Sequence, residues 1–233
     1  MIKVPYTVTA DIAKYEGDAF NKNPDLQYIE KKKTELFLSG STLSNKKEAV
    51  KALSRYCGFE ETDEIKEIAL QLEEDIAILE NGNLVSICFC FASGFDPLEK
   101  LGQDFMQMHA PVADNQKLQR ASDKVVELIS TPGAMFRRYV WTIAPSSSLS
   151  RHPIRKIHEP IPQSRDSLFF RKETQTTVGA EGGLTFFFVK VEVVPFSSIS
   201  TEDQALVVES INTMTEEVLE YKGLTDIKNL LNA

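Results

Sequence analysis

The feature that most constrains the fold is a pair of long β-prone stretches joined by a glycine-containing turn. Residues 168–177 and 184–194 are rich in Phe, Thr and Val, and the segment Gly179 to Gly183 separates them. Aromatic and β-branched residues favour strands, and a short glycine-containing segment between two such runs is typical of a hairpin. The sequence therefore predicts a β-hairpin over residues 168–194.

The remaining elements are segregated along the chain. Helical patterns dominate the first part, and strands that are close in sequence dominate the later part, which is typical of an α+β fold with a mostly antiparallel sheet rather than of a Rossmann-type alternation. We expect one domain over residues 1–233, with an N-terminal helical region at about 24–80. The predicted helices cover residues 24–38, 46–56, 65–79, 97–109, 115–130, 201 onward and 225–231, and the further strands cover 84–91 and 135–143.

The third of these helices depends on a stripe of apolar residues. Ile65, Ile68, Leu72, Ile76 and Leu79 recur every three or four positions. This spacing places them on one face of an α-helix. Asn81-Gly82 follows and predicts a turn into the strand at 84–91.

Composition limits the classes of partner. The 233 residues carry a net charge of −8 with a pI of about 5.1. An acidic chain is a poor match to nucleic acid or to an anionic membrane surface, and no apolar run reaches the 18–20 residues, roughly, of a membrane span. The three cysteines are Cys57, Cys88 and Cys90, and their odd number favours a cytoplasmic location over a set of disulfides. They contain no CxxC pair, which disfavours structural zinc.

The densest functional signal is Phe95 to Gly102 followed by Met108 to Val112. The helix should end near His109, because Pro111 keeps the preceding residue out of helical geometry. A histidine at a helix end is often a simple cap stabilised by the helix dipole, so a structural cap is one of the two interpretations of His109, beside a ligand. The other histidines, His152 and His158, lie in a Ser- and Pro-rich loop at 145–166, a length that often covers a site.

A second signal is a polar face on the first strand of the hairpin. Alternation places Arg171, Glu173 and Gln175 on one side. They could be solvated, form a cross-strand ladder, or line a polar pocket. No Walker A, GxGxxG, HExxH or GxSxG motif occurs, so the residues by themselves indicate an α+β domain with a candidate pocket.

Several segments, taken in order, resemble the α subunit of haem-dependent oxidative N-demethylase and its relatives. Two positions depart from that family's pattern: Val140 stands where the family has Asn, and Thr174 where it has Arg. The similarity covers about Tyr28 to the C-terminus. The segments that carry it are Glu74-Asp75-Ile76-Ala77-Ile78-Leu79, Phe95 to Gly102, Met108 to Val112, Arg138-Tyr139-Val140-Trp141, Phe170 to Thr177 and Tyr221-Lys222-Gly223.

This resemblance implies a PAS-like fold that encloses haem b, with His109 as the axial ligand to the iron. Arg171 or Arg138 would pair with the haem propionates, Lys100 would do so less directionally, and Glu173 and Gln175 would fix these cations or polarise a distal ligand. The implied reaction is O2-dependent demethylation of a small amine such as dimethylamine, giving formaldehyde, with electrons from subunits that carry flavin and iron–sulfur centres. There are two alternatives: a haem-binding sensor without turnover, and a domain that has lost haem and acts in binding.

Overall fold

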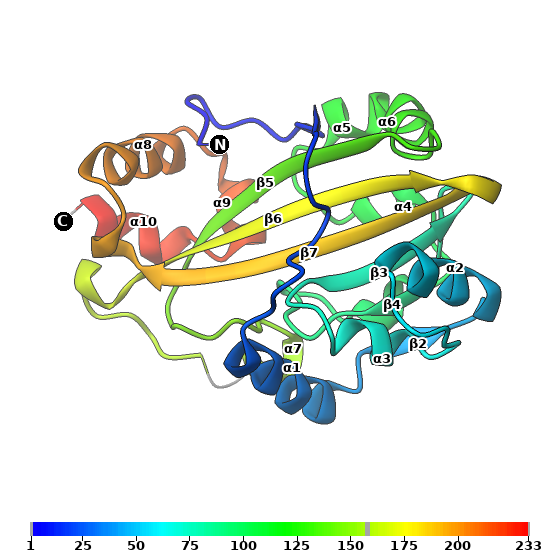
Figure 1. Cartoon of the computed structure of the whole chain (residues 1–233). Helices are drawn as coiled ribbons and strands as arrows, with labels where there is room; N and C mark the ends of the chain where they lie inside the picture. The colour runs from blue at the N-terminus through cyan, green and yellow to red at the C-terminus, as the bar shows by residue number, and fades with distance from the viewer. Residues whose placement is uncertain (1, 157–158, 233) are drawn as a thin grey trace.

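The computed structural model describes residues 2–156 and 159–232, and its strands form one antiparallel sheet of seven strands (Figure 1). Their order in the sheet is β1-β5-β6-β7-β3-β4-β2. With helices before, between and after the strands, the fold is α+β, as the sequence predicts. The strands are β1 (Ala13–Lys14), β2 (Thr42–Ser44), β3 (Asp75–Glu80), β4 (Asn83–Cys88), β5 (Met135–Ala144), β6 (Phe169–Ala180) and β7 (Leu184–Pro195).

Ten α-helices and four short 3-10 helices accompany the sheet in the described residues. The α-helices are α1 (Leu26–Ser39), α2 (Lys47–Cys57), α3 (Ile65–Ala69), α4 (Phe105–His109), α5 (Gln116–Arg120), α6 (Ser122–Ile129), α7 (Pro153–Lys156), α8 (Thr201–Asn212), α9 (Glu216–Lys222) and α10 (Thr225–Asn232). The 3-10 helices are η1 (Pro97–Lys100), η2 (Arg165–Ser167), η3 (Glu181–Gly183) and η4 (Phe196–Ser198).

The predicted hairpin is the centre of the sheet. β6 and β7 pair along their whole length, from Phe169 opposite Pro195 to Ala180 opposite Leu184. The turn uses Gly182 and Gly183, both at φ 74°, a conformation that favours glycine. β5 then extends the sheet from β6, and the β3–β4 hairpin extends it from β7. The PAS-like description of this sheet stays a prediction.

The predicted helix over 65–79 is wrong. The structure has only the five-residue helix α3, and the Glu74-Asp75 segment opens strand β3 instead of a helix. β3 lies between β7 and β4 and every residue from Asp75 to Leu79 is buried. A strand buried on both faces shows no polar alternation, so its apolar run mimics a helical stripe.

Two other predicted helices are interrupted, and an additional short strand forms. The 97–109 segment divides into η1 and α4, because Leu101 takes an extended conformation and the Asp104 side chain caps a new helix. The 115–130 segment divides into α5 and α6 at Ala121. Residues 42–44 form the edge strand β2 against β4.

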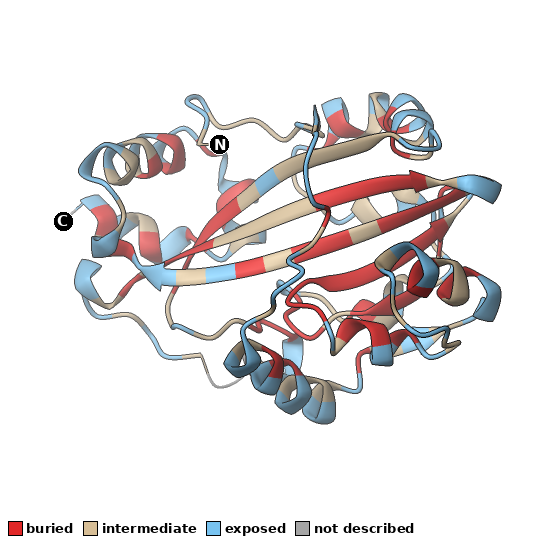
Figure 2. Ribbon diagram, viewed as in Figure 1, coloured by how far each residue is buried: buried red, intermediate tan, exposed pale blue. Residues whose placement is uncertain are grey.

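The sheet has two differently covered faces. α1–α3 supply the core on the face of Phe186 and Phe188, and α8–α10 gather at one end of the sheet around Trp141 and Phe170 (Figure 1). Figure 2 shows the resulting band of buried residues through β3, β6 and β7. On the opposite face, Leu98 of η1, the following Leu101 and Met108 of α4 pack against Ala77, Leu84 and Ile87.

Candidate functional site

The polar face of β6 is an ordered hydrogen-bond ladder inside the protein. Arg171 Nη1 lies 2.7 Å from Glu173 Oε1, and Gln175 Nε2 donates to Glu173 Oε2 at 2.8 Å. The Arg171 residue is only 1% exposed. The predicted pairing of Arg171 with Glu173 is confirmed, and the solvated-face alternative is wrong for these side chains.

Arg171 also holds the long loop at 145–166 to the sheet. Its Nη2 donates to Phe91 O at 2.8 Å and to Leu149 O at 3.2 Å. The loop continues along the same segment, where Arg151 N donates to Ala92 O at 2.8 Å. Most of the Arg171 donors are therefore satisfied by the protein itself, and the loop is fixed beside the end of β4.

Arg138 differs from Arg171 although it lies on the same face. It is opposite Gln175 in the β5–β6 register, and it is half-buried. Its Nε, like that of Arg171, is shielded from solvent without a hydrogen-bond partner, but within the described part of the chain no ion pair involves the Arg138 guanidinium. Burial lowers the pKa of Arg138, and the nearby charge of Glu173 opposes that shift. Arg138 is a shielded cation that lacks an anionic contact.

His109, the last residue of α4, has a defined protonation pattern. Its Nδ1 lies 2.7 Å from Phe105 O, and since a carbonyl can only accept, Nδ1 carries the hydrogen. Burial lowers the pKa of His109, and the positive charges of Arg138 and Lys100 lower it further, while the Phe105 hydrogen bond opposes them. The ring is therefore a neutral imidazole whose Nε2 lone pair is available to a metal.

The helix that carries His109 is short and lightly packed. Asp104 and Gln107 form a reciprocal capping box at its start, and no residue of α4 is buried. Asn115 Nδ2 donates to His109 O at 2.9 Å and so fixes the end of the helix. The His109 ring also lies against Phe105, with centroids 4.2 Å apart. Local contacts therefore orient this histidine.

His152 has the opposite hydrogen-bond pattern. Its Nδ1 accepts a hydrogen bond from Ile154 N at 3.3 Å, so in the neutral ring Nε2 carries the hydrogen. Nε2 is buried without a hydrogen bond, 3.7 Å from Asp96 Oδ1. Neither nitrogen offers a lone pair to a metal in this arrangement. His158 lies outside the described residues.

The structure thus assembles most of the residues singled out in the sequence. Arg138 and Lys100 act electrostatically on His109, and Arg138 adjoins Gln175 and Glu173. Arg171 joins the group through Glu173. Lys222 was not identified from the sequence as a site residue. Its sequence signal was its place in Tyr221-Lys222-Gly223, one of the segments that carry the family resemblance.

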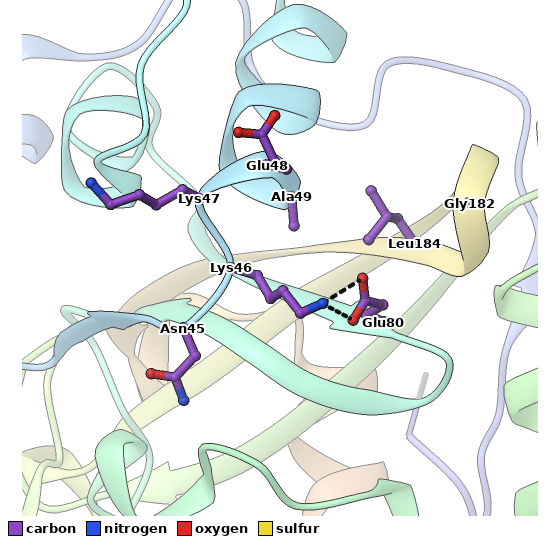
Figure 3. A pocket seen from close by; sticks show the side chains of 8 residues that line it. All are labelled: Asn45, Lys46, Lys47, Glu48, Ala49, Glu80, Gly182 and Leu184. Atoms are coloured by element: carbon purple, nitrogen blue, oxygen red, sulfur yellow. Dashed lines mark hydrogen bonds and ion pairs between the residues drawn. The ribbon is translucent and has the colours of Figure 1, made fainter.

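Two hollows on the surface lie elsewhere. One, of about 300 Å³, opens between the start of α2, the end of β3 and the β6–β7 turn (Figure 3). In it Lys46 Nζ pairs with the Glu80 carboxylate at 2.9 Å, so its central charges are balanced. The other, of about 290 Å³, is bounded by Arg151, Glu159 and Gly223 among others. Neither hollow is lined by His109, Arg138 or the β6 ladder.

The comparison with protein families gives one finding. The family model described as haem-dependent oxidative N-demethylase, alpha subunit-like, matches residues 26–231. No curated protein matches the chain. Among the helices of the described residues, none has the length and apolar character to cross a membrane.

Proposed function

Since residues 26–231 match that model, the chain belongs to the haem-dependent oxidative N-demethylase alpha-subunit-like family, and we propose that it binds haem b in a PAS-like domain formed by residues 1–233. Attachment is non-covalent, because the sequence contains no CxxCH motif. His109 is the axial ligand to the iron.

The observation that supports this proposal most strongly is the tautomer of His109. Nδ1 donates to Phe105 O, which leaves the Nε2 lone pair for iron and orients the ring. A histidine that ligates a metal commonly donates its other N–H to a backbone carbonyl in this way. His152 has the reverse pattern. The donor set therefore fits a haem with a single protein ligand from α4.

The charged residues around His109 suit the rest of a haem. Arg138 lacks an anionic partner and is opposite Gln175, so a propionate carboxylate would satisfy it. Lys100, at the end of η1, would add a less directional positive charge. Arg171 supports the pocket indirectly, because it orients Glu173 and holds the loop at Leu149.

We further propose that the substrate is a small secondary or tertiary amine such as dimethylamine, with O2 as oxidant and formaldehyde as product. The haem supplies the oxygen chemistry when bound. Each oxygen of Glu173 accepts one hydrogen bond, from Arg171 and Gln175, and keeps acceptor capacity for an ammonium group. Glu173 and Gln175 would thus orient the amine, and partner subunits with flavin and iron–sulfur centres would supply electrons.

The first test is spectroscopic. Protein expressed with adequate haem should show a Soret band, and pyridine haemochrome analysis should identify haem b. His109→Ala should abolish or strongly shift the Soret band, whereas His152→Ala should leave it in place. A colourless protein that hemin cannot reconstitute would disprove haem binding, and a spectrum sensitive only to His152 would disprove the assignment of the ligand.

A second candidate function is haem-dependent sensing without turnover. The observation in its favour is that both Glu173 oxygens already hold protein donors, as in a structural network. Amine turnover separates the two functions: a holoprotein supplied with NADPH and a reductase should release formaldehyde from dimethylamine. Ligand binding to the haem without formaldehyde release would favour the sensor.

A further inference from the structure

The side chain of Lys222, the last residue of α9, lies where the N-terminal segment, β5 and α9 meet. Its Nζ donates to Trp141 O at 3.0 Å. The same nitrogen lies 5.5 Å from the centroid of the Tyr6 ring and 5.8 Å from that of the Trp141 ring. The two rings meet edge to face at 89°. The amine is therefore bordered by two aromatic side chains and one backbone carbonyl.

The described residues give this amine one hydrogen bond and no ion pair. A carbonyl acceptor needs only one N–H, so a neutral amine satisfies the contact with Trp141 O and keeps its lone pair free. Lys32 has the opposite arrangement, because its Nζ donates to three carbonyls and only an ammonium has three N–H groups. The contacts of Lys222 do not require the charged form.

The surroundings of Lys222 also favour the neutral amine. Burial lowers the pKa of Lys222 to about 8, the charge of Glu173 opposes this shift, and the charges of Arg151 and Arg138 add to it. Lysines that act as nucleophiles in proteins are desolvated or lie near other cations in the same way. Near neutral pH, a larger share of Lys222 than of an ordinary lysine is therefore the nucleophilic form.

This amine lies close to the surface. Lys222 is half-buried, and both of its neighbours in the chain, Tyr221 and Gly223, are exposed. The rings of Tyr6 and Trp141 limit the space around Nζ. This position favours a small reactant over a bulky one.

We propose that the Lys222 amine is a nucleophile that captures a small aldehyde as an iminium. The nitrogen lone pair forms a bond to the carbonyl carbon, and one amine proton moves to the carbonyl oxygen to give a carbinolamine. A proton from solvent then converts the hydroxyl group into water, which leaves, and the iminium keeps the positive charge. A cation within about 6 Å of an aromatic face is stabilised, so the Tyr6 and Trp141 rings favour this adduct.

The aldehyde assigned to this site is formaldehyde, the product of the proposed demethylation, and this assignment rests on the proposed function. To test it, the full-length protein is incubated at pH 7.5 with deuterated formaldehyde and sodium cyanoborohydride, which reduces an iminium to a methylamine. Mass spectrometry of the peptides gives the methylation rate at each lysine. Lys124, exposed on α6, and Lys32 are the internal controls.

We expect Lys222 to be methylated at least about tenfold faster than Lys124. The change in pKa from 10.5 to about 8 gives on the order of a hundredfold more neutral amine, and the lower basicity and partial burial reduce this advantage. The rate at Lys222 should stop rising above about pH 8. Lys32 should stay unmodified while the protein is folded, because its three N–H groups are held by carbonyls.

A matched pair of variants tests the contribution of the aromatic rings. Tyr6→Ala exposes the amine to water and removes one ring, so it should lower the rate at Lys222 toward that at Lys124. Tyr139→Ala, which removes an exposed tyrosine of β5, should leave the rate at Lys222 unchanged.

Methylation of Lys222 in the parent protein no faster than that of Lys124 would overturn the inference. So would fast acylation of Lys222 by N-hydroxysuccinimidyl acetate together with slow reaction with formaldehyde, because the amine would then be reactive without forming an iminium. If Lys222 captures formaldehyde but the protein releases none from dimethylamine, the aldehyde site stands and the proposed demethylation fails.

Discussion

Lys32 in α1 and Lys222 in α9 are both shielded lysines, and they differ in how their charge is satisfied. Lys32 is 0% exposed and donates to Ala69 O at 2.7 Å, to Leu72 O at 2.8 Å and to Glu74 O, so all three of its N–H groups are used. Asp75 Oδ1 lies 3.7 Å away as a counter-charge. Lys222 has one carbonyl and two aromatic rings.

Arg171 in β6 and Arg138 in β5 repeat this contrast. Both side chains have a shielded Nε without a partner, but Arg171 also bonds to a carboxylate and two carbonyls, whereas no hydrogen bond within the described residues involves the Arg138 guanidinium. A buried cation held by several protein acceptors fixes the fold. One without them is available to a ligand, and its charge destabilises the empty protein. The following predictions test whether this distinction holds.

The largest expected effect is at Lys32. Lys32→Met should lower the free energy of unfolding by about 3–5 kcal/mol, because it leaves Asp75 and the carbonyls at the end of α3 buried without a donor. Urea unfolding followed by circular dichroism measures this loss. Lys33→Met, on the exposed side of the same helix, removes only a surface pair with Glu30 and should cost at most about 0.5 kcal/mol. Equal losses in the two variants would contradict the structural role of Lys32.

The second comparison is between Arg171 and Arg138. Arg171→Met should cost about 3 kcal/mol in the apoprotein, because Glu173, Phe91 O and Leu149 O lose a buried donor. Arg138→Met should change the stability by less than about 1 kcal/mol, because no protein hydrogen bond is lost. Both variants are measured by urea unfolding without haem. A large loss for Arg138→Met would show that the protein itself satisfies that cation.

The third comparison concerns pH. The pKa of Lys222 is lowered from 10.5 to about 8, so between these values the unfolded chain binds this proton more tightly than the folded protein does. The contribution of Lys222 to stability should therefore rise with pH across that window. The charged and titratable groups that face it are Tyr6 in the N-terminal segment, Arg138 in β5, Glu173 in β6 and Arg151 in the loop.

The matched measurement is the free energy of unfolding of the apoprotein and of Lys222→Met from pH 7 to pH 10.5. Titrations that are common to both proteins cancel in the difference. The parent should gain stability relative to the variant as the pH rises through the window. A difference that is constant with pH would mean that Lys222 keeps its ordinary pKa, and that its environment resembles that of a solvated lysine.

Local pattern was sufficient for much of the fold. Residue types and turn chemistry predicted the β6–β7 hairpin, the helix α1 and the turn at Asn81-Gly82, because each depends on contacts between near neighbours in sequence. Strand alternation also predicted correctly that Arg171 and Glu173 share a face and pair. The stripe at 65–79 was misread, because a strand buried on both sides carries no periodic signal to separate it from a helix.

The sequence by itself determined the α+β class, the family resemblance and the polar residue types available for a site. Tertiary structure decided which of these groups are satisfied. Lys32 and Lys222 look alike in the sequence, and only long-range contacts distinguish them. Lys32 donates to three carbonyls, whereas Lys222 donates to one carbonyl and forms no ion pair within the described residues. The tautomers of His109 and His152, by contrast, depend on backbone groups only four and two residues away. Satisfaction of a buried charge depends on groups distant along the chain, which no local pattern encodes.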